Sequence, residues 1–204
     1  MRNGSWTLPV PRRWNRGMSD EPRNSENSET NESTENTEAV ADPAVSVVGP
    51  GDGETILLGT TRMRVLEDGS HTGHRLGMAE SVLAPYTPGP PQHRHARHDE
   101  GFYVISGTVR FTVGDEDIDA TAGTLVMVPP GAPHTFANAT GEPARMLSTF
   151  TPDLYVQYFR DLEELYAGGR TPTREESLGT MSRYATEPAT DFAPLYAPAR
   201  GTGS

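Results

Sequence analysis

Residues 93–107 read His-Arg-His-Ala-Arg-His-Asp-Glu-Gly-Phe-Tyr-Val-Ile-Ser-Gly. Three of the chain's six histidines and one glutamate fall within the first eight of these residues, directly before an apolar, β-prone run. Because His93 and His95 are two residues apart, an extended strand would point both to the same face. Imidazoles together with a carboxylate suit a divalent first-row metal. The alternative is a solvated, histidine-rich loop, which this stretch alone leaves open.

Short β-prone segments surround this stretch, and they are broken by Gly, Pro and Asp. Ser106-Gly107 separates two of them as a tight hairpin, and in 108–113 apolar residues alternate with polar ones, so one face of that strand is buried. Many short strands at this spacing predict an all-β sandwich or barrel. The candidate strands are 54–59, 61–66, 75–84, 101–106, 108–113, 117–121, 124–128, 134–138 and 144–150.

After Phe150 the period becomes helical. Thr151 and Pro152 predict a helix start, as N-cap and first helical residue, and Gly168-Gly169 ends the helix. Thr173 and Glu176 form the pattern of a capping box before a second helix. These two helices are too small for a core of their own, so we expect them to pack on the β domain.

The chain begins with a basic stretch and continues with an acidic one. Residues 1–18 contain four arginines and no acid, whereas 19–42 are rich in Asn, Ser, Thr and Glu without an apolar face. Translation starting at Met18 would explain the basic stretch, and a basic docking or targeting arm is the alternative. The predicted organisation is a disordered acidic region (1–50), a β-barrel (51–152), helices packed on it (153–186) and a flexible tail (187–204).

Composition excludes several classes of function. The 204 residues contain no cysteine and no lysine, which removes disulfides, thiolate metal sites and lysine Schiff bases. A formal charge of −11 argues against nucleic-acid or anionic-membrane binding. No apolar run approaches the roughly 18 residues of a membrane span, and no apolar signal region follows the N-terminal arginines. A soluble, cytoplasmic protein is expected by default.

A second motif pairs with the first. Residues 123–138 read Gly-Thr-Leu-Val-Met-Val-Pro-Pro-Gly-Ala-Pro-His-Thr-Phe-Ala-Asn. This stretch resembles the second signature motif of the cupin superfamily, and residues 93–107 resemble the first. The matching positions are His93, His95, Glu100 and Gly107 in the first motif, and Gly123, Pro129, Gly131, His134 and Asn138 in the second. One position departs, because Thr87 stands where the family usually has a glycine and Gly89 follows two residues later.

The resemblance implies a double-stranded β-helix barrel of the jelly-roll type. It also implies four metal ligands converging inside the barrel: His93, His95, Glu100 and His134. Such a set could hold Fe, Mn, Ni, Co, Cu or Zn, and ligand type alone does not choose among them. His98 competes as a ligand, but we expect it in a loop at the barrel rim. His71 and His74 lie in a Gly/Ser turn and are expected to be solvated.

An apolar pocket is expected beside these ligands, since alternation places Phe102 on the face of Glu100 and Phe136 on that of His134. Phe111 and Met127 are further candidates for its lining. Within the superfamily the chain is similar to bacterial quercetin dioxygenase-like cupins. That similarity implies cleavage of an enolic or aromatic small-molecule substrate by dioxygen, with Glu100 as the base.

Two other functions stay open from the sequence. The first is a metal or small-molecule binding module without turnover. The second is a sugar-phosphate isomerase, which would need inward basic residues that the strands near the motifs do not supply. A homodimer formed through edge strands, with the strand region near 54–66 as one candidate, is expected from the family.

Overall fold

The computed structural model describes residues 45–189. The predictions for 1–44 and 190–204, including a start at Met18 and a basic arm, lie outside the described residues. The strands are β1 Thr55–Leu58, β2 Thr61–Asp68, β3 Gly77–Leu83, β4 His93–His95, β5 Asp99–Ser106, β6 Thr108–Val113, β7 Glu116–Thr121, β8 Leu125–Val128, β9 His134–Ala137, β10 Ala144–Thr151 and β11 Thr186–Pro188. The helices are α1 Leu154–Leu165 and α2 Arg174–Arg183, with a short 3-10 turn at Ala167–Gly169 between them.

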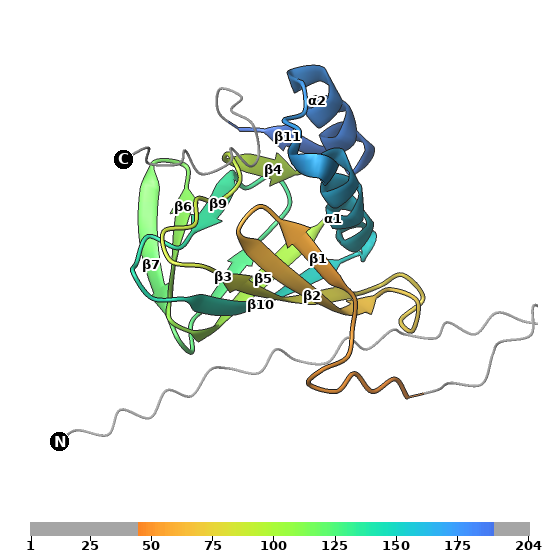
Figure 1. Cartoon of the computed structure of the whole chain (residues 1–204), viewed down its shortest axis with the longest axis horizontal. Coiled ribbons are helices and arrows are strands. Elements are labelled where there is room, and N and C mark those ends of the chain that lie inside the picture. Colours follow the sequence, from red (N-terminus) through yellow and green to blue (C-terminus); the bar gives the residue numbers. More distant parts are fainter. Residues whose placement is uncertain (1–44, 190–204) are drawn as a thin grey trace, which may run out of the picture. The chain divides into compact units, whose positions relative to one another are not determined.

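The strands form two antiparallel sheets that face each other, as the jelly-roll prediction required (Figure 1). One sheet has the order β1-β2-β3-β10-β5-β8 and the other the order β11-β4-β9-β6-β7. β10 lies between β3 and β5, which joins the start of the barrel to its first motif. β4 pairs with β9 through His93 and His134, so the two motifs become neighbours in one sheet.

Alternation along the strands fills one half of the barrel with apolar side chains. Val109 and Phe111 on β6 are fully buried, while the residues between them are partly exposed, as the sequence pattern predicted. At the turn before β6, Gly107 has a φ of 75°, and a Cβ there would lie 2.6 Å from the Pro143 carbonyl oxygen. The barrel core consists of Leu83, Phe102, Val104, Val109, Phe111, Ala120, Val128, Ala144 and Met146.

A second apolar cluster joins α1 to the barrel. Figure 1 shows α1 and α2 together at the end where β4 and β11 run. From α1, Tyr155, Val156, Tyr158 and Leu162 are buried against β1, β2, β3 and β10. Burial of Val156 and Leu162 stabilises this docking by about 1.5–3 kcal/mol each. The helices therefore pack on the β domain, and α1 is anchored firmly.

The predicted start of α1 was wrong by two residues. Thr151 still pairs with Asp99 as the last residue of β10, so it cannot cap a helix, and Asp153 occupies the N-cap position. The capping box of α2 is confirmed, since the Thr173 side chain accepts from the Glu176 amide and the Glu176 side chain accepts from the Thr173 amide. No helix among residues 45–189 is long and apolar enough to cross a membrane.

The chain after α2 returns to the barrel as a strand that the sequence did not predict. β11 pairs with β4, with Thr186 opposite His95 and Pro188 opposite His93. The first residues of the predicted flexible tail are therefore part of the sheet that carries two candidate metal ligands. The rest of that prediction concerns residues beyond the described part.

Candidate metal centre

Three buried histidines converge inside the barrel. On β4, His93 and His95 point inward while Arg94 between them is exposed, and His134 faces His93 from β9. One ring nitrogen from each of the three lies within 4.8 Å of the others. Glu100, at the start of β5, places Oε2 2.9 Å from His134 Nε2 and 3.3 Å from His95 Nε2. The structure thus brings all four predicted ligands to one place.

Each histidine is held by its other ring nitrogen. His93 Nδ1 donates to the Pro91 carbonyl at 2.9 Å, and His134 Nδ1 donates to the Ala132 carbonyl at 3.0 Å. His95 Nδ1 lies 2.8 Å from Thr186 Oγ1, and the Thr186 hydroxyl donates to the Tyr184 carbonyl. Because that hydroxyl proton is already used, Thr186 accepts from His95 Nδ1–H. All three rings therefore keep Nε2 for the interior of the barrel.

This arrangement fits a divalent cation. In the neutral rings, three Nε2 lone pairs face the Glu100 carboxylate, and such acceptors repel one another unless a positive charge lies among them. Outer hydrogen bonds that fix the tautomer of each histidine are the usual support of metal-ligating imidazoles. The donor set of three imidazoles and one carboxylate suits Zn, Fe, Mn, Co, Ni or Cu.

The directions of the pKa shifts at this centre also favour one positive charge there. Burial raises the pKa of Glu100, but the contacts of its carboxylate with the His134 and His95 rings outweigh burial and hold that pKa below its usual value. Burial lowers the pKa of His134, and its hydrogen bond to Glu100 raises it above the ordinary value. Burial, followed by the charges of His134 and His95, lowers the pKa of His93 to about 3. One cation, a proton on His134 or a metal ion, is favoured beside an ionised Glu100.

Gly89 and Asn138 shape the backbone around the ligands. A Cβ on Gly89 would lie 1.5 Å from the Phe136 carbonyl oxygen, so only glycine lets this segment approach β9. Thr87, which replaces the family's usual glycine, is buried with its hydroxyl 3.1 Å from that of Thr60. Asn138 Nδ2 donates to the carbonyls of Leu83, Ala84 and Glu142, which ties the end of β9 to neighbouring loops.

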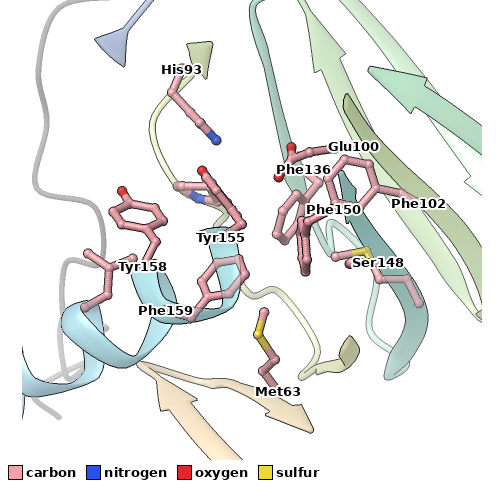
Figure 2. Close-up of a pocket in the computed structure, with 13 residues that line it drawn as sticks. Met63, His93, Glu100, Phe102, Phe136, Ser148, Phe150, Tyr155, Tyr158 and Phe159 are labelled. Atoms are coloured by element: carbon pink, nitrogen blue, oxygen red, sulfur yellow. The ribbon is translucent and has the colours of Figure 1, made fainter. Parts of the chain in front are cut away.

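A small, largely apolar cavity of about 30 Å³ adjoins the ligands. His93 and Glu100 form one side of it, and Phe102, Phe136, Phe150 and Tyr155 are among its aromatic walls (Figure 2). The volume is enough for about two water molecules. It is far below the roughly 300–1,000 Å³ of a pocket for a drug-sized ligand.

Two of the four predicted pocket residues lie elsewhere. Phe111 is fully buried in the barrel core, where it packs on Phe102 and Phe136 from behind the cavity wall. Met127 points outward with 58% of its surface exposed. Val126 and Val128 supply the inner face of β8, and Met127 lies over the outer side of Gly101. In an apolar strand, the pattern of side chains does not show which face is inside.

His98 lies in the loop between β4 and β5, as predicted, but it is buried instead of lying at the rim. Its ring stacks on that of His95, with centroids 5.0 Å apart and planes at 5°, and meets Tyr155 edge-on. Burial, and next the charge of His95, lowers its pKa to about 4, so the ring is neutral. Among residues 45–189 the metal-competent histidine group consists of His93, His95 and His134.

Two residues at this site were missed by the sequence analysis. Tyr155, from the first turn of α1, places its hydroxyl 3.0 Å from His95 Nε2, and Thr186, from β11, holds the opposite nitrogen. Both come from the segment after the barrel. The helical stripe that contains Tyr155 predicted burial but gave no sign of which residues it would meet.

The two-sheet barrel topology is that of the double-stranded β-helix class. Residues 79–150 match the family described as a cupin domain, so the chain contains a domain of that family.

The chain is similar in sequence to two other proteins described here and similar in fold to a third. Quercetin 2,3-dioxygenase of Bacillus subtilis (strain 168) is 24% identical over 132 residues, which is 65% of this chain and 39% of that protein. An uncharacterized protein of Streptomyces coelicolor is 39% identical over 61 residues, which is 30% of this chain and 56% of that protein. The chain thus spans less than two thirds of either relative. Among solved structures, the polyketide cyclase RemF from Streptomyces resistomycificus has a TM-score of 0.48 at 23% identity, covering 53% of this chain and 80% of that one.

Proposed function

We propose that this protein is a metal-dependent dioxygenase acting on a flavonol-like or other enolic, aromatic substrate. One observation carries the proposal: the Glu100 carboxylate contacts the histidine cluster and also lines the aromatic cavity. An acidic enol O–H entering that cavity would therefore meet a base beside the metal ligands. The sequence relationship to quercetin 2,3-dioxygenase of Bacillus subtilis supports the same reaction class.

Different residues of the chain have different roles in the proposed reaction. His93, His95 and His134 would hold a divalent ion, which when bound supplies the positive charge that stabilises an enolate beside dioxygen. Glu100, ionised because its pKa is lowered, accepts the proton of the enol O–H through its carboxylate. Phe102, Phe136 and Phe150 orient the ring and exclude water. Both oxygen atoms of dioxygen enter the product, so no external reductant is required.

The size of the cavity restricts the substrate. With α1 in place, about 30 Å³ is open, room for about two water molecules, so even a one-ring ligand enters only when the cavity walls, including Tyr155 on α1, move outward. Exposing the apolar face of α1 would cost several kcal/mol, because two of its buried aliphatic side chains alone account for about 3–6 kcal/mol. A compact enolic substrate therefore requires a smaller displacement of α1 than an extended one.

Oxygen consumption tests the proposal. Protein reconstituted separately with each of the six divalent metals is mixed with flavonols and with smaller enols, and oxygen uptake is followed with an electrode. We expect uptake with at least one metal, and Glu100→Gln should retain metal but lose most of that turnover. Full uptake by the metal-loaded variant would refute Glu100 as the base.

A non-catalytic binding module is the second candidate, and the tightly closed cavity favours it. An apolar site sealed by an anchored helix suits retention of a small molecule as well as turnover. The two candidates separate in the same experiment, since a binding module would take up metal and ligand without consuming oxygen under any metal.

We also propose a homodimer. β1 and β8 are the two edges of the six-stranded sheet, and Leu57 on β1 and Leu125 on β8 are more than half exposed. Edge strands with exposed apolar side chains favour pairing with a second copy. Sedimentation velocity of the full chain should then show twice the monomer mass, and a monomer at all concentrations would contradict the proposal.

A further inference from the structure

The hydroxyl of Tyr155 lies against the nitrogen that would bind a metal. Its oxygen is 3.0 Å from His95 Nε2, and Glu100 Oε2 is 3.3 Å from the same nitrogen. Since His95 Nδ1 carries the proton donated to Thr186, Nε2 accepts and the Tyr155 O–H donates. Figure 2 shows the hydroxyl pointing toward the end of the cavity where His93 and Glu100 lie.

Packing fixes the Tyr155 ring in this position. The ring is 3% exposed and meets His95 edge-on at 4.5 Å, His98 at 4.9 Å and Phe159 at 5.0 Å. Phe150 and Tyr158 close the remaining sides. A phenol held between five rings cannot swing away without moving α1, so with α1 docked on the barrel its hydroxyl lies beside the histidine cluster.

The Tyr155 hydroxyl can donate a hydrogen bond, whereas the atoms of the histidine cluster around it are acceptors. In neutral rings the three Nε2 atoms are acceptors, and so is the ionised Glu100 carboxylate. An enolate in the cavity is an acceptor as well, and it needs a donor in addition to a cation. If the Nε2 lone pair of His95 were used to hold a metal ion, the Tyr155 O–H would lose this acceptor and could donate to a ligand oxygen beside it.

We propose that Tyr155 is a substrate-binding residue of this centre, whose O–H donates a hydrogen bond to the oxygen anion of an enolic ligand in the cavity. The inference rests on the metal site and enolic ligand of the proposed function, but it does not require turnover. It assigns to α1 a direct part in ligand recognition, beyond closing the barrel.

Ligand binding without turnover tests this assignment. Protein loaded with Zn²⁺ is titrated calorimetrically with maltol, a compact enol with an adjacent carbonyl. Tyr155→Phe removes the hydroxyl and keeps the ring packing, and we expect it to bind Zn²⁺ in the same amount but maltol about 10- to 150-fold more weakly, as for loss of a hydrogen bond to a charged group. Tyr103→Phe is the matched control, since Tyr103 is exposed on the outer face of β5.

The methyl ether of maltol provides the control on the ligand side. It cannot form the enolate, so wild type and Tyr155→Phe should bind it equally. Three results would each overturn the role of Tyr155. The first is equal maltol affinity in the two Zn²⁺-loaded proteins, and the second is that Tyr155→Phe loses as much affinity for the ether as for maltol. The third is no maltol binding by the wild type. Maltol binding that depends on Tyr155, without oxygen uptake under any metal, would instead refute the dioxygenase proposal and leave this inference standing.

Discussion

The strands that carry the histidines and the segment that follows the barrel meet at one centre but contribute different chemistry. β4, β5 and β9 supply acceptor atoms, and paired strands hold them rigidly. Residues 154–188 supply what surrounds those atoms: the Tyr155 hydroxyl, an aromatic wall and the Thr186 oxygen that orients His95. The candidate metal ligands thus all lie within the barrel, while the side chains that surround and orient them come from the chain's later elements.

Loss of a barrel ligand should have the largest effect. His93→Ala removes one of three converging imidazoles from a buried site, and no other described side chain takes its place. We expect metal affinity to fall by more than the 10- to 100-fold typical of outer partners, so that the purified variant carries almost no metal. Elemental analysis of protein purified without chelators measures this.

His71→Ala is the control for the loss of a histidine, because His71 lies exposed in the loop between β2 and β3. It should keep the metal content of the wild type. A metal content unchanged in His93→Ala, or lowered equally in both variants, would refute the barrel cluster as the metal site.

Removing the outer partner of His95 should have a smaller effect. Thr186→Val keeps the shape of the side chain but takes away the acceptor of His95 Nδ1–H, 2.8 Å away. We expect metal affinity to fall about 10- to 100-fold, because the imidazole loses its fixed tautomer and orientation. Competition with a chelator measures the affinity, and Thr186→Ser, which keeps the hydroxyl, should stay close to wild type. If Thr186→Val also binds as the wild type does, β11 has no part in the metal centre.

The difference between the two regions also explains what the sequence could reveal. The ligand spacing and the alternation in 108–113 are local, because a strand's period decides which side chains share a face. The hairpin at Gly107 and the capping box at Thr173 are equally local, and the structure has both. Strand pairing across the barrel then brings His93 to His134, which the two motifs together implied.

Contacts of Tyr155 and Thr186 depend on how the chain folds back over the barrel, and no local pattern encodes that. The three-residue strand β11 lacks a period long enough to detect, and its backbone partner, β4, lies about 90 residues earlier in the chain. Met127 fails for another reason, since both faces of β8 are apolar and alternation cannot choose between them. The burial of His98 follows from its stacking on His95, a neighbour that the loop brings into place.

The smallest expected effect concerns one ion pair between the β2–β3 loop and the start of α1. His74 Nδ1 lies 3.0 Å from Asp153 Oδ2, at the N-cap of α1, and the hydrogen bond and charge of Asp153 raise the pKa of His74 above 6.5. Since the folded state binds this proton more tightly, the stabilisation is fully present below pH 6.5 and disappears as the pH rises through the raised pKa of His74.

His74→Asn removes the charge and still tolerates the positive φ of 59°. Thermal melts of both proteins from pH 5.5 to 9 should show a slightly lower melting temperature for the variant on the acid side only. A difference that is independent of pH would mean that the β2–β3 loop and α1 are joined by packing, not by this ion pair.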